Sequence, residues 1–534
     1  MQLHTCLLSA AILAALSVSA PAHAARPDQS PATARALGLI AGHGKSVLRA
    51  DADGFVAKDV IVDKDGTEHV RFDRTYRGLA VLGGDVVVHS RNGQLKQASL
   101  TLKTTGRPDV TPTVSADQAI VEAGTKFGTG FNGVPSSRLV IYARGASPTL
   151  AHEVVFSGFK ADRTPTDMHY IVDAHSGRIL EKWDTIETGK PGGGGTCTGT
   201  AAVGTGHGLY VGTVALNSTN CGSSFQMKDM TRGGGYTTDM ANGTRGSGTM
   251  FTDADNNWGT GSNADRASAA ADAHYGIATT WDYYKNTFGR NGIANDGKGA
   301  LSKVHYSRNY VNAFWSDACF CMTFGDGDGV NYGPLVNLDV AGHEMSHGVT
   351  SRSANLTYSG ESGGLNEATS DIFGTMVEFY ANNANDPGDY LIGEKIYLKY
   401  PAGNHALRYM YHPSLEGPSY SKDCWSSTLG SLDVHYSSGP ANHFFYLLAE
   451  GAVSPAGFNY TASQLVCNGD TGVTGIGRSD AQRIWYRALD LYFTSSTTYP
   501  QARAGTLQAA ADLFGSGSAQ YNAVARAWSA VNVN

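Results

Sequence analysis

The chain lacks any run of basic residues. It holds 40 Lys and Arg against 47 Asp and Glu, which gives a formal net charge of -7 at pH 7. Nucleic-acid binding needs a concentrated basic surface that neutralises phosphates. The composition therefore argues against a nucleic-acid partner.

Long apolar runs are also missing beyond the N-terminus. The one long apolar stretch, Cys6 to Ser19, is shorter than the roughly 20 residues of a membrane-spanning helix. It ends before the small-residue triplet at 22–24, a pattern typical of signal-peptide cleavage, although the first residues lack the usual Lys or Arg. We interpret residues 1–24 as a secretory signal peptide, with a buried N-terminal helix as the alternative. We therefore expect a secreted, extracellular protein without a membrane anchor.

Cysteine is scarce. Of seven cysteines, Cys6 would leave with the signal peptide, and the remaining six are compatible with three disulfides in an oxidising compartment. Cys197 with Cys221, and Cys424 with Cys467, are plausible pairs, but the sequence does not establish connectivity.

The segment Cys319-Phe320-Cys321 is harder to interpret. In a regular strand its two thiols face one side with Cβ atoms about 6 to 7 Å apart, beyond the roughly 4 Å of a disulfide. A disulfide there requires a bend in the chain, and a soft-metal site is the alternative.

Changes in composition along the sequence divide the chain into segments. The 534 residues exceed what one hydrophobic core usually serves, so we expect two or three domains. Residues 25–188 alternate short β-rich runs with turns and hold a helical candidate at 115–127. Residues 189–195, mostly glycine, cannot pack a core, and we interpret them as a linker and natural processing site.

The pattern changes after this linker. Residues 196–335 are rich in Gly, Ser, Thr and Tyr, whereas the region after Ser437 is mainly helical in pattern. The clearest expected elements are a strand at 209–214 and helices at 264–287, 441–450 and 480–491. A β-rich lobe followed by an α-rich lobe places a ligand site in the cleft between them.

The most informative segment is 343–347, His-Glu-Met-Ser-His, followed after nineteen residues by Glu367. Residues four apart project from one face of a helix, so His343 and His347 can bind one cation with Glu344 beside it. Two imidazoles and one carboxylate leave the fourth tetrahedral position open for water, as in a catalytic zinc site. The alternative is a solvated helix that carries two histidines.

A second helix is expected to begin at Glu367, after Gly363 and Gly364. Apolar residues recur at helical spacing along its opposite side: Leu365, Ile372, Met376 and Phe379. Asp371, one turn beyond Glu367, can accept a hydrogen bond from the non-ligating nitrogen of a ligand histidine.

The same two helices predict a second metal site. Asp339 lies one turn before His343, and Glu378 lies about three turns after Glu367. In antiparallel packing Asp339 and Glu378 face each other about two turns from zinc, and Asp389 can add a third oxygen ligand. Facing carboxylates repel unless a hard cation bridges them, which favours calcium. Two solvated carboxylates are the alternative.

With these motifs in place, the chain resembles the thermolysin family of secreted gluzincin endopeptidases over nearly all of its length. Residues 343–347 and 363–371 resemble the family's two zinc motifs, and residues 433–439 its third active-site motif. The resemblance implies an α+β fold with a β-rich catalytic lobe at 196–350 and a helical lobe at 351–534.

The resemblance also implies a propeptide. Residues 51–103 and 115–186 resemble the two propeptide modules of the family, here termed the FTP-like and PepSY-like modules. Such a propeptide acts as an intramolecular chaperone and as an inhibitor until autoprocessing. The other expected partners are protein and peptide substrates, and the expected mature enzyme is a monomer.

Individual roles follow from the resemblance. Tyr358 and His435 would stabilise the oxyanion, Asp433 would orient His435, and Arg408 would bind a substrate carbonyl. Asn312 and Ala313 resemble the group that pairs with the substrate backbone, and Tyr332, Leu335, Val340 and Leu407 resemble the apolar pocket after the scissile bond. Asp339, Glu378, Asp389 and the Leu391 carbonyl match calcium ligands, whereas Thr375 stands where related enzymes carry a second glutamate.

Taken singly, several of these residues have ordinary explanations. His435 fits a surface loop, Tyr358 a packing position, and Arg408 a structural ion pair. Only their occurrence together with the zinc motifs favours function.

The implied reaction is peptide hydrolysis by a zinc-activated water with Glu344 as general base, on the amino side of bulky hydrophobic residues. A rival interpretation is a secreted binding or adhesion protein with a degenerate peptidase fold. Such a protein is expected to lack a ligand or the base, and neither is missing here. A third interpretation gives residues 25–188 a separate inhibitory function in trans.

The linker position predicts a mature chain of roughly 340 residues. Intact mass and N-terminal sequencing of the secreted protein measure this length, and the same mass reports how many cysteines are oxidised. A secreted form that keeps residues 25–188 in one continuous chain would contradict the assignment.

Overall fold

The computed structural model describes residues 27–128, 130–160, 163–185, 197–400, 405–417 and 419–534. The expected signal peptide at 1–24 and linker at 189–195 lie outside these residues. Among the described helices, none is both long and apolar enough to cross a membrane.

The segment before the linker folds around one sheet of nine strands. The strands are β1 (Asp53–Val62), β2 (Thr67–Tyr76), β3 (Leu79–Leu82), β4 (Val86–Arg91), β5 (Gln94–Leu100), β6 (Ser136–Tyr142), β7 (Thr149–Phe159), β8 (Pro165–Asp173) and β9 (Ile179–Asp184). Their order is β5-β4-β2-β3-β6-β7-β8-β9, with β1 paired to β2. Parallel pairing of β3 with β6 joins the two halves, so the modules predicted at 51–103 and 115–186 share one sheet.

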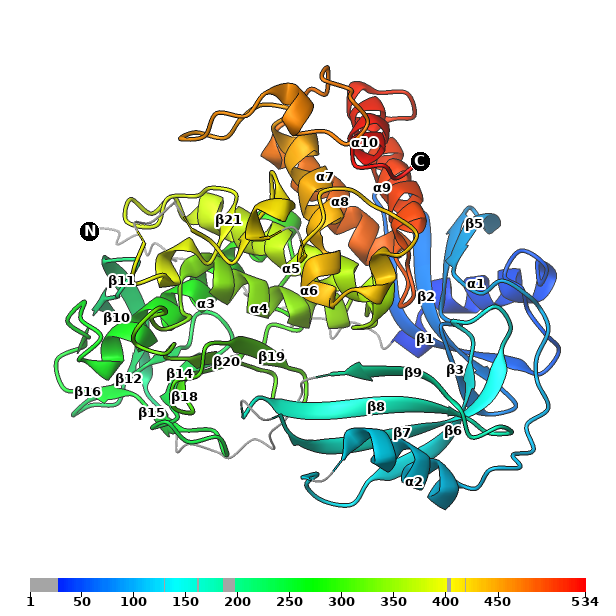
Figure 1. Ribbon diagram of the computed structural model, residues 1–534, viewed down its shortest axis with the longest axis horizontal. Helices are drawn as coiled ribbons and strands as arrows, with labels where there is room; N and C mark the ends of the chain where they lie inside the picture. The colour runs from blue at the N-terminus through cyan, green and yellow to red at the C-terminus, as the bar shows by residue number, and fades with distance from the viewer. Residues whose placement is uncertain (1–26, 129, 161–162, 186–196, 401–404, 418) are drawn as a thin grey trace, which may run out of the picture.

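One helix covers each half of this sheet (Figure 1). Helix α1 (Pro31–Gly42) packs Ile40 against Val70 and Val88, and α2 (Ala116–Phe127) packs Ala123 near Phe156. Ser115 and Gln118 form a reciprocal capping box at the start of α2. The helix expected at 115–127 is confirmed, and this cap explains why it begins there.

Two smaller sheets and one long helix, α3 (Arg266–Phe288), form the first lobe after the linker. The first sheet has the order β16-β12-β11-β10-β17 and the second the order β13-β14-β18-β20-β19, with β15 on β14. Their bounds are β10 (Thr200–His207), β11 (Thr213–Asn220), β12 (Phe225–Gln226), β13 (Lys228–Asp229), β14 (Gly235–Asp239), β15 (Thr249–Met250), β16 (Thr252–Asp253), β17 (Asn257–Trp258), β18 (Leu301–Tyr306), β19 (Ala313–Ser316) and β20 (Cys321–Gly325). Because β19 ends the second sheet, one of its backbone edges lacks a strand partner within the described chain.

The strand expected at 209–214 is wrong for residues 209–212, and only its last two residues lie in a strand, as the start of β11. Residues 208–212 form a turn between β10 and β11. The buried carboxylate of Asp272 on α3 accepts hydrogen bonds from the backbone N–H groups of Leu209, Tyr210 and Val211 at 2.5 to 3.1 Å. A contact between residues more than 60 positions apart therefore overrides the local β-propensity.

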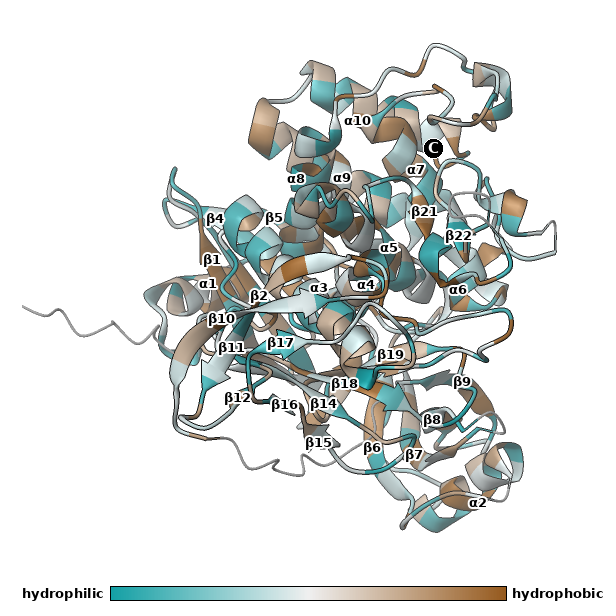
Figure 2. Cartoon of the chain, turned by 90° about the vertical axis from the view of Figure 1, so that its left-hand side faces the viewer, coloured by the Kyte–Doolittle hydropathy of each residue, from teal (hydrophilic) through white to brown (hydrophobic). Residues whose placement is uncertain are grey.

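The helices α4 (Leu338–Ser351) and α5 (Gly360–Ala381) lie at the centre, between the smaller sheets and the helical lobe (Figure 2). Helix α5 begins at Gly360, two turns before Glu367, so the predicted start is wrong. A Cβ atom on Gly363 would lie 2.3 Å from Val434, and one on Gly364 would lie 2.5 Å from the Ser437 hydroxyl. The glycine pair therefore permits close packing against the next element instead of marking a helix start.

Helices dominate the last part of the chain. They are α6 (Val434–Ser437), α7 (Gly439–Ala449), α8 (Arg478–Arg487), a π-helical turn η6 (Ala488–Tyr492), α9 (Tyr499–Phe514) and α10 (Ala519–Ala530). Trp485 and Trp528 are fully buried among them, and Trp528 stacks on Phe444 with ring centroids 3.7 Å apart. The helices expected at 264–287, 441–450 and 480–491 are confirmed, with the last one ending in the π turn.

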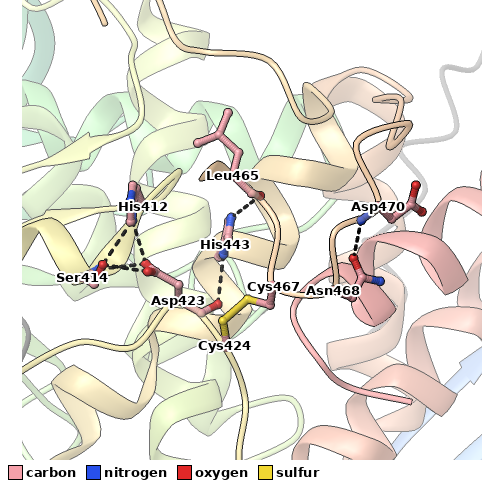
Figure 3. The surroundings of a disulfide bond; sticks show 9 residues. All are labelled: His412, Ser414, Asp423, Cys424, His443, Leu465, Cys467, Asn468 and Asp470. Carbon is pink, nitrogen blue, oxygen red and sulfur yellow. Dashed lines mark hydrogen bonds and ion pairs between the residues drawn. A yellow bond between two sulfur atoms is a disulfide. The ribbon is translucent and has the colours of Figure 1, made fainter. Parts of the chain in front are cut away.

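All six cysteines after Cys6 form disulfides: Cys197–Cys221, Cys319–Cys321 and Cys424–Cys467. The Cys319–Cys321 bond is made possible by the predicted bend, in which Phe320 adopts a positive φ of 52°. Figure 3 shows Cys424–Cys467, beside which His443 bridges the carbonyls of Asp423 and Leu465 at 2.9 Å each.

The contact between α4 and α5 generates a stability prediction. A Cβ atom on Gly374 would lie 2.5 Å from the carbonyl oxygen of Asp339. Because an overpacked core costs about 1–3 kcal/mol, Gly374→Ala should lower the free energy of unfolding by that amount and separate the two helices. Denaturant unfolding measures the change. Gly38→Ala on α1 is the matched control, since its Cβ would meet nothing within 4 Å; an equal effect of both variants would contradict the packing argument.

Candidate functional site

Three side chains from α4 and α5 converge as the sequence predicts. The Nε2 atoms of His343 and His347 are 3.1 Å apart, and Glu367 carboxylate oxygens lie 3.5 and 3.4 Å from them. Ligand bonds of about 2.0–2.1 Å in a tetrahedral zinc site give edges of roughly 3.3 Å. The Glu367 Oε2 atom is buried without a hydrogen-bond partner, which fits a cation at this point.

Each histidine is oriented through its other ring nitrogen. His343 Nδ1 donates to Asp371 Oδ1 at 2.8 Å, and His347 Nδ1 donates to Asn366 Oδ1 at 2.8 Å. The Asn366 amide in turn donates to the Leu356 carbonyl at 2.8 Å, which sets the amide orientation. Both Nε2 atoms are thereby left available to a metal ion.

Glu344 lies beside these ligands, with 6% of its surface exposed. Burial raises the pKa of its carboxyl to about 7. Glu367 behaves differently, because the neighbouring histidines, His435 first among them, outweigh burial and hold its pKa at about 2. The two glutamates therefore differ in proton affinity although both are buried.

Tyr358 and His435 also approach Glu367, and Asp433 contacts His435. The Tyr358 hydroxyl donates to Glu367 Oε1 and is 3.3 Å from His435 Nε2. Asp433 Oδ1 accepts from His435 Nδ1 at 2.7 Å and from the His435 backbone N–H at 3.0 Å. Burial lowers the pKa of His435, but the Glu367 and Asp433 carboxylates outweigh it and raise the pKa above its usual value.

Asp371 anchors a group of donors. Arg408 forms a bidentate pair with it through Nε and Nη2 at 2.7 Å each, and Asn442 on α7 donates to Asp371 Oδ2 at 2.8 Å. These donors and His343 outweigh burial and lower the pKa of Asp371. Asn366 and Asn442 were not predicted, because no motif spacing identifies an amide that acts through a neighbouring side chain.

A cavity of about 1510 Å³ opens onto His343, His347 and Glu367. The predicted Asn312, Ala313, Leu335, Val340 and Leu407 line it, together with Ile392, which was not predicted. Tyr332 does not belong to this lining: its backbone bridges Tyr397, and the two rings pack with centroids 5.1 Å apart. Trp183 on β9 and Thr185 just after it line the same cavity.

A second cluster of acids lies farther along α4 and α5. Oxygens of Asp339, Glu378 and Glu394 lie within 4.8 Å of one another, and all three residues are buried. Glu378 Oε1, Glu394 Oε2 and Asp386 Oδ1 are buried without hydrogen-bond partners. Burial and mutual repulsion raise the pKa of Asp339 to about 7 and that of Glu378 well above its usual value.

The remaining predicted calcium ligands lie next to this cluster. Asp389 donates its backbone N–H to Glu378 Oε2 at 3.1 Å, and its carboxylate accepts from the Leu391 N–H at 2.7 Å. Leu391 is buried in β21 (Leu391–Ile392), which pairs with β22 (Arg408–Tyr409). Thr375 contacts Met410 and contributes no carboxylate. Glu394 and Asp386 were missed, because only the fold of the loop after α5 brings them to Asp339.

Comparison with known proteins places this chain among metallopeptidases. Residues 203–351 match the thermolysin metallopeptidase catalytic domain, residues 354–533 its alpha-helical domain, and residues 53–102 the fungalysin/thermolysin propeptide motif. A transglutaminase-activating metalloprotease of Streptomyces mobaraensis is 49% identical over 484 residues, which cover 90% of this chain and 61% of that protein.

More distant relatives match most of their own length. Thermolysin of Alicyclobacillus acidocaldarius is 39% identical over 488 residues, covering 88% of this chain and 84% of its own. The solved precursor of protealysin, a metalloproteinase from Serratia proteamaculans, is 30% identical over 56% of this chain and 87% of its own, with a TM-score of 0.44.

Proposed function

Because this chain belongs to the thermolysin family of metallopeptidases, we propose that it is a secreted zinc endopeptidase that cleaves on the amino side of bulky apolar residues. Its propeptide motif makes it a zymogen of that family. The observation that carries the proposal is the convergence of His343, His347 and Glu367 at 3.1 to 3.5 Å, with one Glu367 oxygen left unpaired. This donor set suits zinc, and these three residues would hold it.

Bound zinc would supply a Lewis acid and lower the pKa of a bound water toward 7. Glu344 takes the proton from the attacking water on its carboxylate and passes it to the leaving nitrogen. Its burial next to the ligands favours this role, since a pKa near the working pH lets one carboxyl both accept and donate.

The developing oxyanion requires donors that are already in place. His435 Nε2 and the Tyr358 hydroxyl, 3.3 Å apart beside Glu367, would donate to it. Asp433 holds the Nδ1–H of His435, so the ring presents Nε2 toward the cavity. One such donor is typically worth about 2.7–4 kcal/mol in the transition state.

Substrate binding follows from the lining of the cavity. Strand β19 is an edge strand, so Asn312 and Ala313 would pair with an extended peptide backbone. Arg408, held rigidly by Asp371, would donate to a substrate carbonyl. The apolar side chains Leu335, Val340, Ile392 and Leu407 would accept a bulky apolar residue after the scissile bond.

Calcium would occupy the acidic cluster. Asp339, Glu378 and Glu394 form its core, with Asp386, Asp389 and the Leu391 carbonyl as further oxygen donors. Unpaired buried carboxylates are costly, and a divalent ion with oxygen ligands removes that cost. The ion would stabilise the loop after α5.

Glu344→Gln tests the reaction. The variant should retain zinc at one ion per chain and an unchanged melting temperature, because Glu344 is not a ligand. Casein hydrolysis and self-processing should fall by about 10²–10⁴, the usual contribution of a general base. Metal analysis, calorimetry and a casein assay measure these quantities. A variant that still cleaves casein would exclude this mechanism, whereas chelator-insensitive behaviour of the wild-type protein would favour the binding-protein interpretation.

Calcium removal tests the second site. A chelator selective for calcium should lower the melting temperature of the processed enzyme, since a ligand at 100 times its Kd stabilises by about 2.7 kcal/mol. Glu394→Gln should weaken calcium binding at least tenfold in a calorimetric titration. Asp296→Asn, at an exposed position, is the matched control. Equal calcium affinity in both variants would show that Glu394 is not a calcium ligand.

A further inference from the structure

One face of the propeptide sheet carries two histidines. In the antiparallel pair of β2 and β4, His69 stands directly opposite His89. Val70 and Val88, their neighbours, point to the other face and form the core with α1. The face with His69 and His89 is covered by the catalytic domain, and each histidine is only 2% exposed.

The catalytic domain covers this face with α8, η6 and α9. The Tyr492 ring of η6 stacks on His89 with centroids 4.9 Å apart and an interplanar angle of 26°. Arg487 of α8 pairs with Asp63 at 2.6 Å and with Asp512 of α9 at 2.8 Å. The histidine pair is therefore buried by association with the catalytic domain and not by the core of its own module.

One set of tautomers satisfies every contact of the pair. Ser99 donates to His89 Nε2 at 2.9 Å, His89 Nδ1–H donates to His69 Nδ1 at 2.7 Å, and His69 Nε2–H donates to Asp63 at 3.2 Å. Both imidazoles are neutral in this chain of hydrogen bonds. The short contact between the two Nδ1 atoms has room for one proton only.

We propose that the His69–His89 pair makes the propeptide's hold on the catalytic domain pH-dependent, so that acidification releases the propeptide and neutral pH retains it. The proposal rests on the proposed function, because it assigns a regulation to the same zymogen. It concerns an interface between segments more than 400 residues apart in sequence, where Arg487 of α8 contacts Asp63 just after β1.

Protonation breaks the network in two steps. A first proton is accommodated if His89 changes tautomer, accepts at Nδ1 and donates from Nε2 to Ser99. A second proton places hydrogen on both Nδ1 atoms, which abolishes their hydrogen bond and forces the rings apart. Because the pair is buried, the separated and charged rings reach water only when the catalytic domain leaves.

Burial and the neighbouring guanidinium groups favour the same direction, while the nearby carboxylates oppose it for His69. Facing the pair are Asp63 after β1, Arg71 on β2, Arg487 on α8 and Asp512 on α9, together with the Tyr492 phenol. Burial, assisted by Arg71 and Arg487, lowers the pKa of His89 well below its usual value. Burial also lowers the pKa of His69 and outweighs the attraction of Asp63.

The lowered pKa values of His69 and His89 determine how the association depends on pH. In a separated propeptide the same face is in water, where an imidazole has a pKa of about 6.5. The association is therefore fully present above about pH 6.5 and weakens as the pH falls, when the separated state binds more protons. The association constant can fall by at most tenfold per pH unit for each proton that is taken up on release.

Hydrogen–deuterium exchange on the full chain tests the proposal. Glu344→Gln in all samples prevents processing, so the readout does not depend on catalysis. Protection factors, corrected for the intrinsic exchange rate, are compared from pH 8 to pH 5 in peptides covering 60–72, 86–95 and 485–495. They should stay constant down to about pH 7 and fall at least tenfold by pH 5, while peptides from α4 and α5 keep their protection.

The double variant His69→Gln/His89→Gln removes both titrating groups and should keep its protection across this range. His43→Gln, at an exposed position in the same module, should behave as the parent. Constant protection in the parent, or an equal fall in the double variant, would overturn the proposal. If the double variant does not fold, His69→Gln alone should halve the dependence of log protection on pH, and an unchanged slope overturns it.

A second measurement uses the processed wild-type protein. On gel filtration the cut propeptide should elute with the catalytic domain at pH 8 and apart from it at pH 5. Absence of self-cleavage would contradict the proposed function, whereas elution together at both pH values would contradict the pH-dependent release alone.

Discussion

The close packing of α4 against α5 is the constraint on which both candidate metal sites depend. A Cβ atom on Gly342 would lie 3.0 Å from the Gly374 Cα, so glycine at these positions lets the helices approach. At one end of the contact Asp371 bonds His343 across the helices at 2.8 Å. At the other end Asp339 and Glu378 meet. One helix pair therefore positions the chemistry and the acidic cluster together.

The buried carboxylates of this helix pair fall into two groups. Asp371 is satisfied by His343, Arg408 and Asn442, so it holds its charge without a metal. Glu367 and Glu378 each keep an oxygen without a partner. Since burial of an unpaired charge is costly, the second group indicates cations, and the first explains how His343 is oriented. The propeptide interface instead buries two imidazoles, and association lowers their pKa so that they stay neutral at a pH where they would bind protons in water.

Local periodicity explains what could be predicted. His343, His347 and Glu367 follow helical spacing, which is set by backbone geometry within a few residues. The helix at 115–127 carries its own cap, so its start could also be predicted from the sequence. The failures come from long-range contacts: Asp272 holds residues 209–211 of the expected strand in a loop, and packing against Val434 and Ser437 accounts for the earlier start of α5.

The convergence of His343, His347 and Glu367, the place of Glu344 beside them and the order of the segments could be predicted from the sequence, because each depends on residue types at short, regular spacing. The tertiary structure was needed to show that Glu394 and Asp386 join Asp339, that Asn366 and Asn442 orient neighbouring side chains, and that Tyr332 stands outside the cavity. It alone also placed Arg487 beside Asp63 and His69. These contacts join residues from separate elements, and no local pattern encodes which loop or helix faces which, because that choice depends on how the whole core packs.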